Sequence, residues 1–479
     1  MRKQLLLLGM TLVFSALAAC ARIPKHLPQN PAFSPQSLVF SQREMSSAGS
    51  WPQADWWKAA KSRQLDELVA AALQQNPELH AAGARVLYAE AQVTRAHSRL
   101  LPHFAAGFQL TQQYFSVQGL HLQANGTSNT FAEFNPLLLQ YHVDLWGRDR
   151  DLVRAARGDL AMSQAEEADA RLLVSSAVAV HYFALRGDES LLRAELRLRA
   201  WQKRALSVAQ AGFTSGLQSA TPLHEASTSL AQSAERIAQL QAAVAAERHA
   251  IAALCGQGPG VQISAAPSSA QASLPLAGVP RNLPLNLLGH RPDIVAARWA
   301  VEAAAARVGA AKAAFYPNIN LHLLAGWNSI HLADLFDPAN FAHALGPAIT
   351  LPIFEGGTLR AALRAQNAVY LAAQDQYQNR ILQALRQVAD LLSTRRALLR
   401  QESALAHAER AQRAQWHVQE TAWQSGLQDG GTRIPVRIRL IQLEEQEITL
   451  QTAAWQNWAL LESALGGGYS ATTKVHPHD

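Results

Sequence analysis

The sequence predicts a mainly α-helical protein with a transmembrane β part, built from two copies of one structural unit. Three observations lead to this prediction. A stretch of 26 residues occurs twice, and each copy is followed by the alternating sequence that is typical of β-strands. Each strand region is followed by a very long helical pattern without proline. A repeat of this size implies two copies of one folded unit, so the function should follow from what that unit builds.

The repeat relates residues 77–102 to residues 292–317. At an offset of 215 residues, the two stretches share nine identities in 26 positions. Both begin with proline, an acidic residue and an aliphatic residue, and both end with proline. Chance matches in alanine-rich sequence would not place matched prolines at both ends. Proline in the first turn of a helix costs no hydrogen bond, so each copy is predicted to form one helix of about 25 residues.

The N-terminus predicts export. Residues 1–20 start with Arg2 and Lys3, continue with a short apolar run and end in Ala-Ala-Cys20, which resembles a bacterial lipoprotein signal. We expect Cys20 to begin the mature chain and to carry acyl chains, each buried methylene contributing about 0.8 kcal/mol to anchoring. The alternative is an ordinary signal peptide with an unrelated cysteine. Ala21, in place of aspartate, resembles the pattern of lipoproteins destined for the outer membrane.

Composition indicates a large folded protein that depends on packing. Apolar residues make up 49% of the chain and charged residues 16%, and the formal charge of +6 falls to +4 when Arg2 and Lys3 leave with the signal. No basic run suggests nucleic acid as a partner. The chain has only Cys20 and Cys255, so no disulfide is expected, and Cys255 is predicted to be a buried helix residue. Beyond the signal we expect no helical membrane span.

A change of period predicts one pair of strands in each half, at about 103–146 and 318–354. Each strand would have roughly 10–15 residues, long enough to cross a membrane as tilted β-structure. The alternating apolar positions are Phe104, Ala106, Phe108 and Leu110 in the first region, and Ile319, Leu321 and Leu323 in the second.

Helical hairpins are predicted after both strand pairs. The long helices would each reach about 100 Å, and each ends at the sequence Ser-Gly-Leu-Gln, repeated at an offset of 210 residues. Return helices follow at about 223–255 and 436–465. The predicted segments are a lipoprotein signal (1–20), an extended tether (21–55), a first repeat (56–255), a connector (256–286), a second repeat (287–466) and a flexible tail (467–479).

Four strands are too few for a closed membrane barrel, since the smallest known barrels use eight. An open sheet edge in lipid leaves backbone groups unpaired at several kcal/mol each, so several chains would have to share one barrel. The alternative is a soluble pair of hairpins on a coiled-coil stalk. The predicted lipid anchor favours the shared barrel.

The chain resembles the outer-membrane efflux proteins, in particular the lipoprotein branch called NodT-type outer-membrane factors. The resemblance covers about residues 51–466. The motifs that carry it are Trp56-Trp57, Leu65-Asp66-Glu67-Leu68, Asn76-Pro77-Glu78-Leu79, Leu254-Cys255-Gly256-Gln257-Gly258-Pro259-Gly260, Arg291-Pro292-Asp293-Ile294, Val308-Gly309-Ala310-Ala311-Lys312-Ala313-Ala314-Phe315-Tyr316-Pro317 and Leu351-Pro352-Ile353-Phe354-Glu355-Gly356-Gly357.

This resemblance implies a TolC-like homotrimer in the outer membrane. Three chains would supply four strands each to one 12-stranded β-barrel, continued by a long periplasmic α-helical barrel. The family's role is a passive exit duct. Its partners would be a periplasmic membrane-fusion adaptor and an inner-membrane pump of the RND, MFS or ABC type, which supplies the energy, and outer-membrane lipid would surround the barrel.

The resemblance also places the aperture and the adaptor docking surface at the two helix tips, residues 212–222 and 425–435. The candidate residues there are Ser215, Gly216, Leu217, Trp423, Ser425, Gly426, Leu427, Arg433 and Arg437. The glycines also suit a left-handed helix end. The best-known members place aspartates just after the turns. Here Pro222 and Pro435 occupy the neighbourhood, and the second turn is longer by about three residues, so no acidic aperture ring is carried over.

Arg433 and Arg437 raise a hypothesis about selectivity. If either faced the tunnel, threefold symmetry would form a positive ring that favours anionic solutes. Alternatively, both arginines lie on the outer face of a solvated helix or pair with Glu444 and Glu445.

Two other functions stay open from the sequence: the outer-membrane component of type I protein secretion, and a periplasmic coiled-coil scaffold without a channel. No metalloprotease, nucleophile-elbow or phosphate-loop motif occurs. Gly256, Gly258 and Gly260 resemble half of a dinucleotide fingerprint but follow a helix instead of a strand. We therefore expect no enzyme activity, cofactor or metal.

Overall fold

The computed structural model describes residues 23–24, 27–30, 51–118, 126–261, 263 and 289–470. The predicted signal with Cys20, most of the predicted tether and connector, and the tail beyond residue 470 lie outside the described residues.

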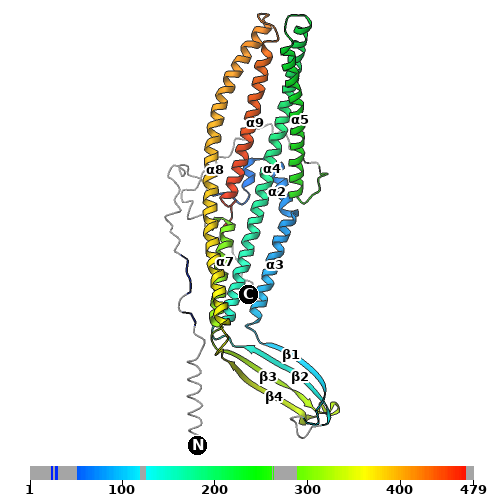
Figure 1. Cartoon of the computed structure of the whole chain (residues 1–479), viewed down its shortest axis with the longest axis vertical. Coiled ribbons are helices and arrows are strands. Elements are labelled where there is room, and N and C mark those ends of the chain that lie inside the picture. Colours follow the sequence, from blue (N-terminus) through cyan, green and yellow to red (C-terminus); the bar gives the residue numbers. More distant parts are fainter. Residues whose placement is uncertain are drawn as a thin grey trace. The chain divides into compact units, whose positions relative to one another are not determined.

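The elements follow the order that the repeat predicts (Figure 1). The first half contains η3 (Trp56–Ala60), α2 (Arg63–Gln75), α3 (Pro77–Ser98), β1 (His103–Tyr114), β2 (Ser128–His142), α4 (Arg148–Thr214) and α5 (Thr221–Leu254). The second half contains α7 (Pro292–Ala313), β3 (Asn318–Ser329), η4 (Leu332–Asp334), η5 (Pro338–Asn340), β4 (Phe341–Thr350), α8 (Thr358–Gln424) and α9 (Arg433–Ala464). A mainly helical chain with four strands confirms the predicted fold class.

The chain forms two compact units. Unit 1 is built around Arg85–Gln164 and Ala296–Gln378 and contains all four strands. Unit 2 contains Ala165–Val295 and the chain from Asn379 onward, and therefore both helical turns.

Local chemistry sets where the N-terminal helices begin. The Ser62 hydroxyl accepts the backbone N–H of Leu65 and so caps α2. The Asn76 side-chain oxygen accepts the N–H of Glu78 at 2.8 Å, while Pro77 occupies the first position of α3, where a missing N–H costs nothing. The Asn76 amide also donates to the Leu254 carbonyl at 2.8 Å, which fixes the start of α3 against the end of α5.

The four strands form one antiparallel sheet in the order β1-β2-β3-β4. The register of β2 shifts between Phe134 and Leu137, where an irregularity takes up Pro136. Proline lacks the N–H that a regular ladder needs, so a bulge is its expected place within a sheet. Gly326 lies opposite, and a Cβ there would collide with the backbone of Phe134 and Asn135.

The core of unit 1 joins α7, α8 and the described part of the N-terminal segment. Phe315 and Leu363 are fully buried, and Ile23 and Leu27 pack against their cluster. Asn30 then donates its amide to the Leu371 carbonyl at 3.0 Å. The described residues near the start of the predicted tether therefore lie along α8.

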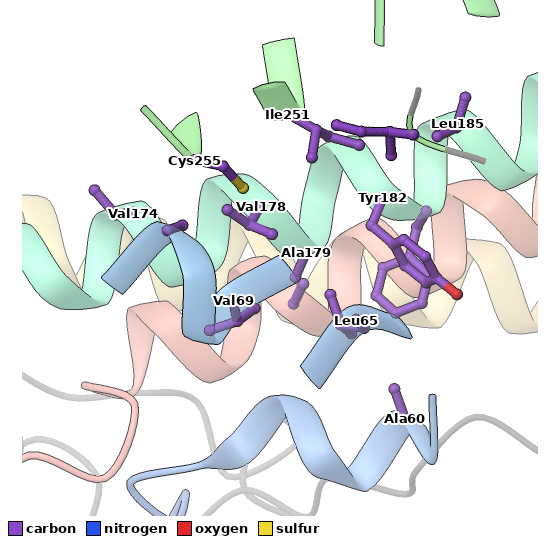
Figure 2. Close-up of a cluster of buried hydrophobic side chains, with 14 of the residues drawn as sticks. Ala60, Leu65, Val69, Val174, Val178, Ala179, Tyr182, Leu185, Ile251 and Cys255 are labelled. Carbon is purple, nitrogen blue, oxygen red and sulfur yellow. The ribbon is translucent and has the colours of Figure 1, made fainter. Parts of the chain in front are cut away.

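The core of unit 2 lies where the short η3 and α2 contact α4 and α5 (Figure 2). Leu65 and Val69 of α2 meet Val178 of α4 and Ile251 of α5, and all four side chains are fully buried. Cys255 is buried beside them, as predicted, at the C-cap of α5.

One helix bears on the expectation that no helical membrane span follows the signal. An 18-residue stretch of α4, with a mean hydropathy of 1.2, is long and apolar enough to cross a membrane by length and composition. Half of that stretch is buried inside the protein. Its apolar character follows from packing in the helical core.

Candidate functional site

The sheet has one apolar face. Directly paired residues of neighbouring strands project to the same side of a sheet. One row of pairs joins Phe104, Leu139, Leu323 and Leu345, and a second joins Phe108, Phe134, Trp327 and Phe341. Phe104, Phe108 and Leu345 are 64%, 58% and 67% exposed, so this chain alone leaves the apolar face uncovered.

The opposite face of the sheet, which we call the polar face, carries two polar rows beside the apolar row of Leu138 and Leu324. One row joins Gln109, Glu133 and Asn328, and another joins His103, Gln140 and His322. An exposed sheet with aromatic and aliphatic side chains on one face and polar side chains on the other is the pattern of a membrane barrel with a water-filled interior.

The outer strands of this sheet each have one unpaired edge. Within the described residues, β1 pairs only with β2, and β4 pairs only with β3. An edge of 10 to 12 residues is long for a natural protein unless another chain covers it.

Aromatic side chains gather near both ends of the strands. Trp146 stacks on Tyr316 at 4.8 Å between ring centroids, and Trp327 lies 5.3 Å from Phe341. Tyr316 and Trp327 are eleven residues apart, or about 36 Å of extended strand, which a tilt of about 40° reduces to roughly 28 Å. This spacing fits aromatic belts at the two surfaces of a membrane.

The two helix tips have the same hydrogen-bonded turn. At the end of α4, the Leu217 N–H donates to the Gly212 carbonyl and the Gly216 N–H to the Phe213 carbonyl. At the end of α8, Leu427 donates to Ala422 and Gly426 to Trp423 in the same way. This is the Schellman motif, which requires a left-handed residue. Gly216 and Gly426 supply it with φ of 70° and 71°.

Both turns present a leucine to solvent. Leu217 is 82% exposed and Leu427 is 79% exposed. Ser215 and Ser425 precede the glycines, and each donates its backbone N–H to the carbonyl four residues earlier. The predicted tip residues therefore form two equivalent turns in sequence and in geometry.

The second turn carries an additional cap. The Asp429 carboxylate accepts the N–H of Gly431 at 2.6 Å and of Thr432 at 3.1 Å. This Asx turn aligns the chain so that α9 begins at Arg433.

Arg433 lies in the middle of an aromatic and acidic cluster. Its guanidinium donates to both carboxylate oxygens of Glu420, at 3.1 and 2.9 Å. It also lies over the ring of Trp423 at 3.4 Å and within 6.0 Å of Trp201 from α4. The Arg433 side chain is only 17% exposed, so the cation–π and ionic contacts act in a partly desolvated place, where both gain strength.

A second set of rings and cations extends this cluster along the helices. Trp201 of α4 meets Trp416 of α8 edge to face at 5.7 Å. Arg437 lies 5.3 Å from the Trp416 ring, and Arg204 lies 4.5 Å from the Trp201 ring. We name Trp201, Trp416, Glu420, Trp423 and Arg433 the tip clamp, because they join α4, α8 and the start of α9.

The tip clamp corrects the hypothesis about arginine partners. Arg433 pairs with Glu420 of α8, a partner that neither alternative named. It does not pair with Glu444, which instead accepts a hydrogen bond from Arg197 at 3.0 Å. Glu445 lies against Glu195.

Glu445 and Glu195 place two carboxyls together between α9 and α4. The Ser233 hydroxyl of α5 donates to Glu195 at 2.6 Å. Burial, followed by the neighbouring Glu195 charge, raises the pKa of Glu445 to about 7. Burial also raises the pKa of Glu462 to about 7. Burial, followed by the neighbouring Asp293 charge, raises the pKa of Asp169 to about 6. These helices therefore hold carboxyls whose pKa values burial raises toward neutral pH.

Sequence reasoning missed the partners in the tip clamp. Trp416 and Trp423 are seven residues apart, a heptad spacing that could have placed both on one face of α8. Glu420 lies four residues after Trp416 and therefore shares that face of α8, whereas Trp201 gave no such signal, because it comes from a separate helix.

Comparisons with known proteins agree with this geometry. Residues 68–257 and 283–467 match the family described as outer membrane efflux protein. The chain is 32% identical over 373 residues to the fusaric acid resistance protein FusA of Burkholderia cepacia, covering 76% of this chain and 70% of that protein. It is 28% identical over 478 residues to the multidrug resistance outer membrane protein MdtP of Escherichia coli, covering 97% and 96%. The crystal structure of the outer membrane protein VceC of Vibrio cholerae is similar with a TM-score of 0.77 at 29% identity, covering 88% of this chain and 100% of that one.

The two faces of the sheet predict opposite responses to the same substitution. Phe108→Arg places a charge on the apolar face and should destabilise the barrel in lipid by about 2–4 kcal/mol if the residue lies near the bilayer midplane. Gln109→Arg is the matched control on the polar face and should be tolerated. Urea unfolding in liposomes measures both, and equal losses would contradict the assignment of the faces.

Removing the Glu420 carboxylate from the tip clamp should make the second turn easier to open. Glu420→Gln leaves the partly buried Arg433 without its ionic partner, which should lower the free energy of opening the second turn by about 1–3 kcal/mol. Hydrogen exchange of residues 425–435 should quicken accordingly. Glu67→Gln is the control, because Glu67 pairs with Arg63 on an exposed helix surface. Unchanged exchange in Glu420→Gln would show that the clamp does not hold the turn.

The raised carboxyl pKa values predict that stability falls as pH rises. Glu445 binds a proton more readily in the folded chain than at its ordinary pKa of 4.5, so its contribution is complete below that value and is lost as pH rises through about 7. The thermal midpoint should therefore decrease from about pH 5 to about pH 8, and Glu445→Gln should flatten this decrease. Glu444→Gln is the control on the same helix. A wild-type slope in Glu445→Gln would refute the assignment to Glu445.

Proposed function

The chain belongs to the outer membrane efflux protein family, and from this premise we propose that it is the exit duct through which an efflux system releases drugs or other small molecules across the outer membrane. This membership confirms the resemblance to the outer-membrane efflux proteins, and the lipoprotein branch stays a prediction. The duct is a passive channel, and no catalytic step is assigned to it.

The two-faced sheet with its open edges carries this proposal. The apolar face suits lipid and the polar face suits water, but four strands cannot enclose a channel. Pairing β4 of one chain with β1 of the next satisfies both edges and, repeated three times, closes a barrel of 12 strands. A homotrimer is therefore the proposed working form, in the TolC-like arrangement.

Lipid attachment and partners complete the proposal. Cys20 would carry the acyl chains, and the segment that ends at Asn30 on α8 would connect them to unit 1. The exposed Leu217 and Leu427 give a periplasmic adaptor two apolar contacts on each chain. The energy would come from an inner-membrane pump.

The relatives favour efflux over the secretion of proteins. FusA is named for resistance to fusaric acid and MdtP for multidrug resistance, which are functions concerned with small molecules. In this proposal the tip clamp keeps the second turn in its resting position, because Arg433 and Glu420 join α8 to α9.

Planar-bilayer recording of the purified, lipidated protein tests the proposal. We expect a trimer with discrete conductance steps, and Glu420→Ala should raise the open probability because it removes the ionic contact of the clamp. Glu67→Gln should behave like the wild type. Silence of both the wild type and Glu420→Ala would refute the channel and favour a scaffold.

A further inference from the structure

Three histidines lie on the polar face of the sheet. His103 of β1 pairs with Gln140 of β2, and Gln140 pairs with His322 of β3, so these three side chains form one row across the sheet. His142 pairs with Asn320, two residues further along the same strands and therefore on the same face. His103 and His322 are exposed in this chain, as groups that line a water-filled interior would be.

His142 differs from the other two histidines. Its Nδ1 is hydrogen-bonded to the Asp149 carboxylate, so a proton gained by His142 is balanced by an acid beside it. Among the described residues, no carboxylate is paired in register with His103 or His322. A proton gained by either of these two adds a net positive charge to the polar face.

The other charged groups around this row are few. On the polar faces of the described strands, the remaining ionisable side chain is Glu133 of β2, in the row with Gln109 and Asn328. Beyond the ends of the strands, Asp144 is paired with Arg150, and Arg148 and Glu355, of opposite charge, line a pocket with His142 and Asp144. The polar-face positions of β4 carry no ionisable side chain: Ala342, Ala344, Gly346, Ala348 and Thr350.

We propose that His103 and His322 set the charge selectivity of the barrel interior, so that the duct favours small organic anions as the pH falls. The inference rests on the proposed function, since it requires that three chains close the sheet into a channel. Two histidines from each chain would then place six protonatable groups around one level of the channel.

The sign of the interior charge follows from these groups. Histidine changes charge between about pH 5 and pH 8, whereas glutamate stays ionised over most of that range. With the histidines neutral, three Glu133 carboxylates make the interior negative. With them protonated, six positive charges outnumber those three. Rings of charged side chains decide which ions pass through a pore, so the preference should change from cations to anions.

The experiment measures reversal potentials in a potassium chloride gradient at about pH 7.5 and about pH 5.5. The wild-type reversal potential should shift toward the equilibrium potential of chloride at the lower pH. H103Q/H322Q should lose most of this shift. H343Q is the matched control, because His343 pairs with Ala325 on the apolar face. It should keep the full shift.

A second variant tests the same two positions by a gain of anion preference, which a misfolded channel would not show. H103K/H322K places permanent positive charges in the same row and should prefer anions at both pH values. All recordings are repeated in the Glu420→Ala background, which separates a closed tip from a change in the barrel.

The outcomes distinguish the inference from its premise. Channels that conduct but show the full shift in H103Q/H322Q, or no shift in the wild type, overturn the role of the histidines and leave the duct intact. Absence of conductance in every background overturns the duct, and the selectivity with it. A loss of the shift in H343Q would also overturn the proposal, because it would assign the effect to the lipid face.

Discussion

The backbone hydrogen bonds at the two open edges of the sheet are the constraint on which the rest of this protein depends. Lipid offers no partner to a backbone amide, so β1 and β4 must find one on another chain before the sheet can enter a membrane. Closure also explains the two different faces of the sheet, since only a closed barrel has one face toward lipid and the other toward water. In the interior strand β2, Pro136 is accommodated by the bulge, where no ladder N–H is needed, and Gly326 leaves room for the displaced backbone.

The helical tips are held by side-chain contacts in addition to backbone hydrogen bonds. Their backbone is fixed by glycines, whereas their position against α4 depends on rings and charges that pack in a partly desolvated place. Packed side-chain contacts of this kind are either formed or broken, and a small shift at a neighbouring surface can change which of the two states is favoured. The proposed duct would have to stay shut without a pump and open with one, which requires a contact of intermediate strength. The Arg433–Glu420 pair, neither deeply buried nor fully exposed, meets that requirement.

The sequence alone predicts the helices, strands and turns, because periodicity, proline and glycine mark them. The matched prolines place α3 and α7, the alternation places the strands, and the repeated Ser-Gly-Leu-Gln places both turns. It does not predict pairing between distant segments. His103 and His322 share a row only through the register of β1, β2 and β3, and Glu420 meets Arg433 only because a hairpin folds.

The twin turns have a consequence for how tightly a partner can be held. Leu217 and Leu427 sit at the same position of the same motif, so a protein that recognises one turn meets a second copy on the same chain and further copies on each neighbour. Linked contacts of this kind raise overall avidity by about 10²–10⁴ without strengthening any single one, because each later contact forms within an existing complex. Individually weak contacts also release one at a time. An assembly held in this way can be durable while its parts exchange readily.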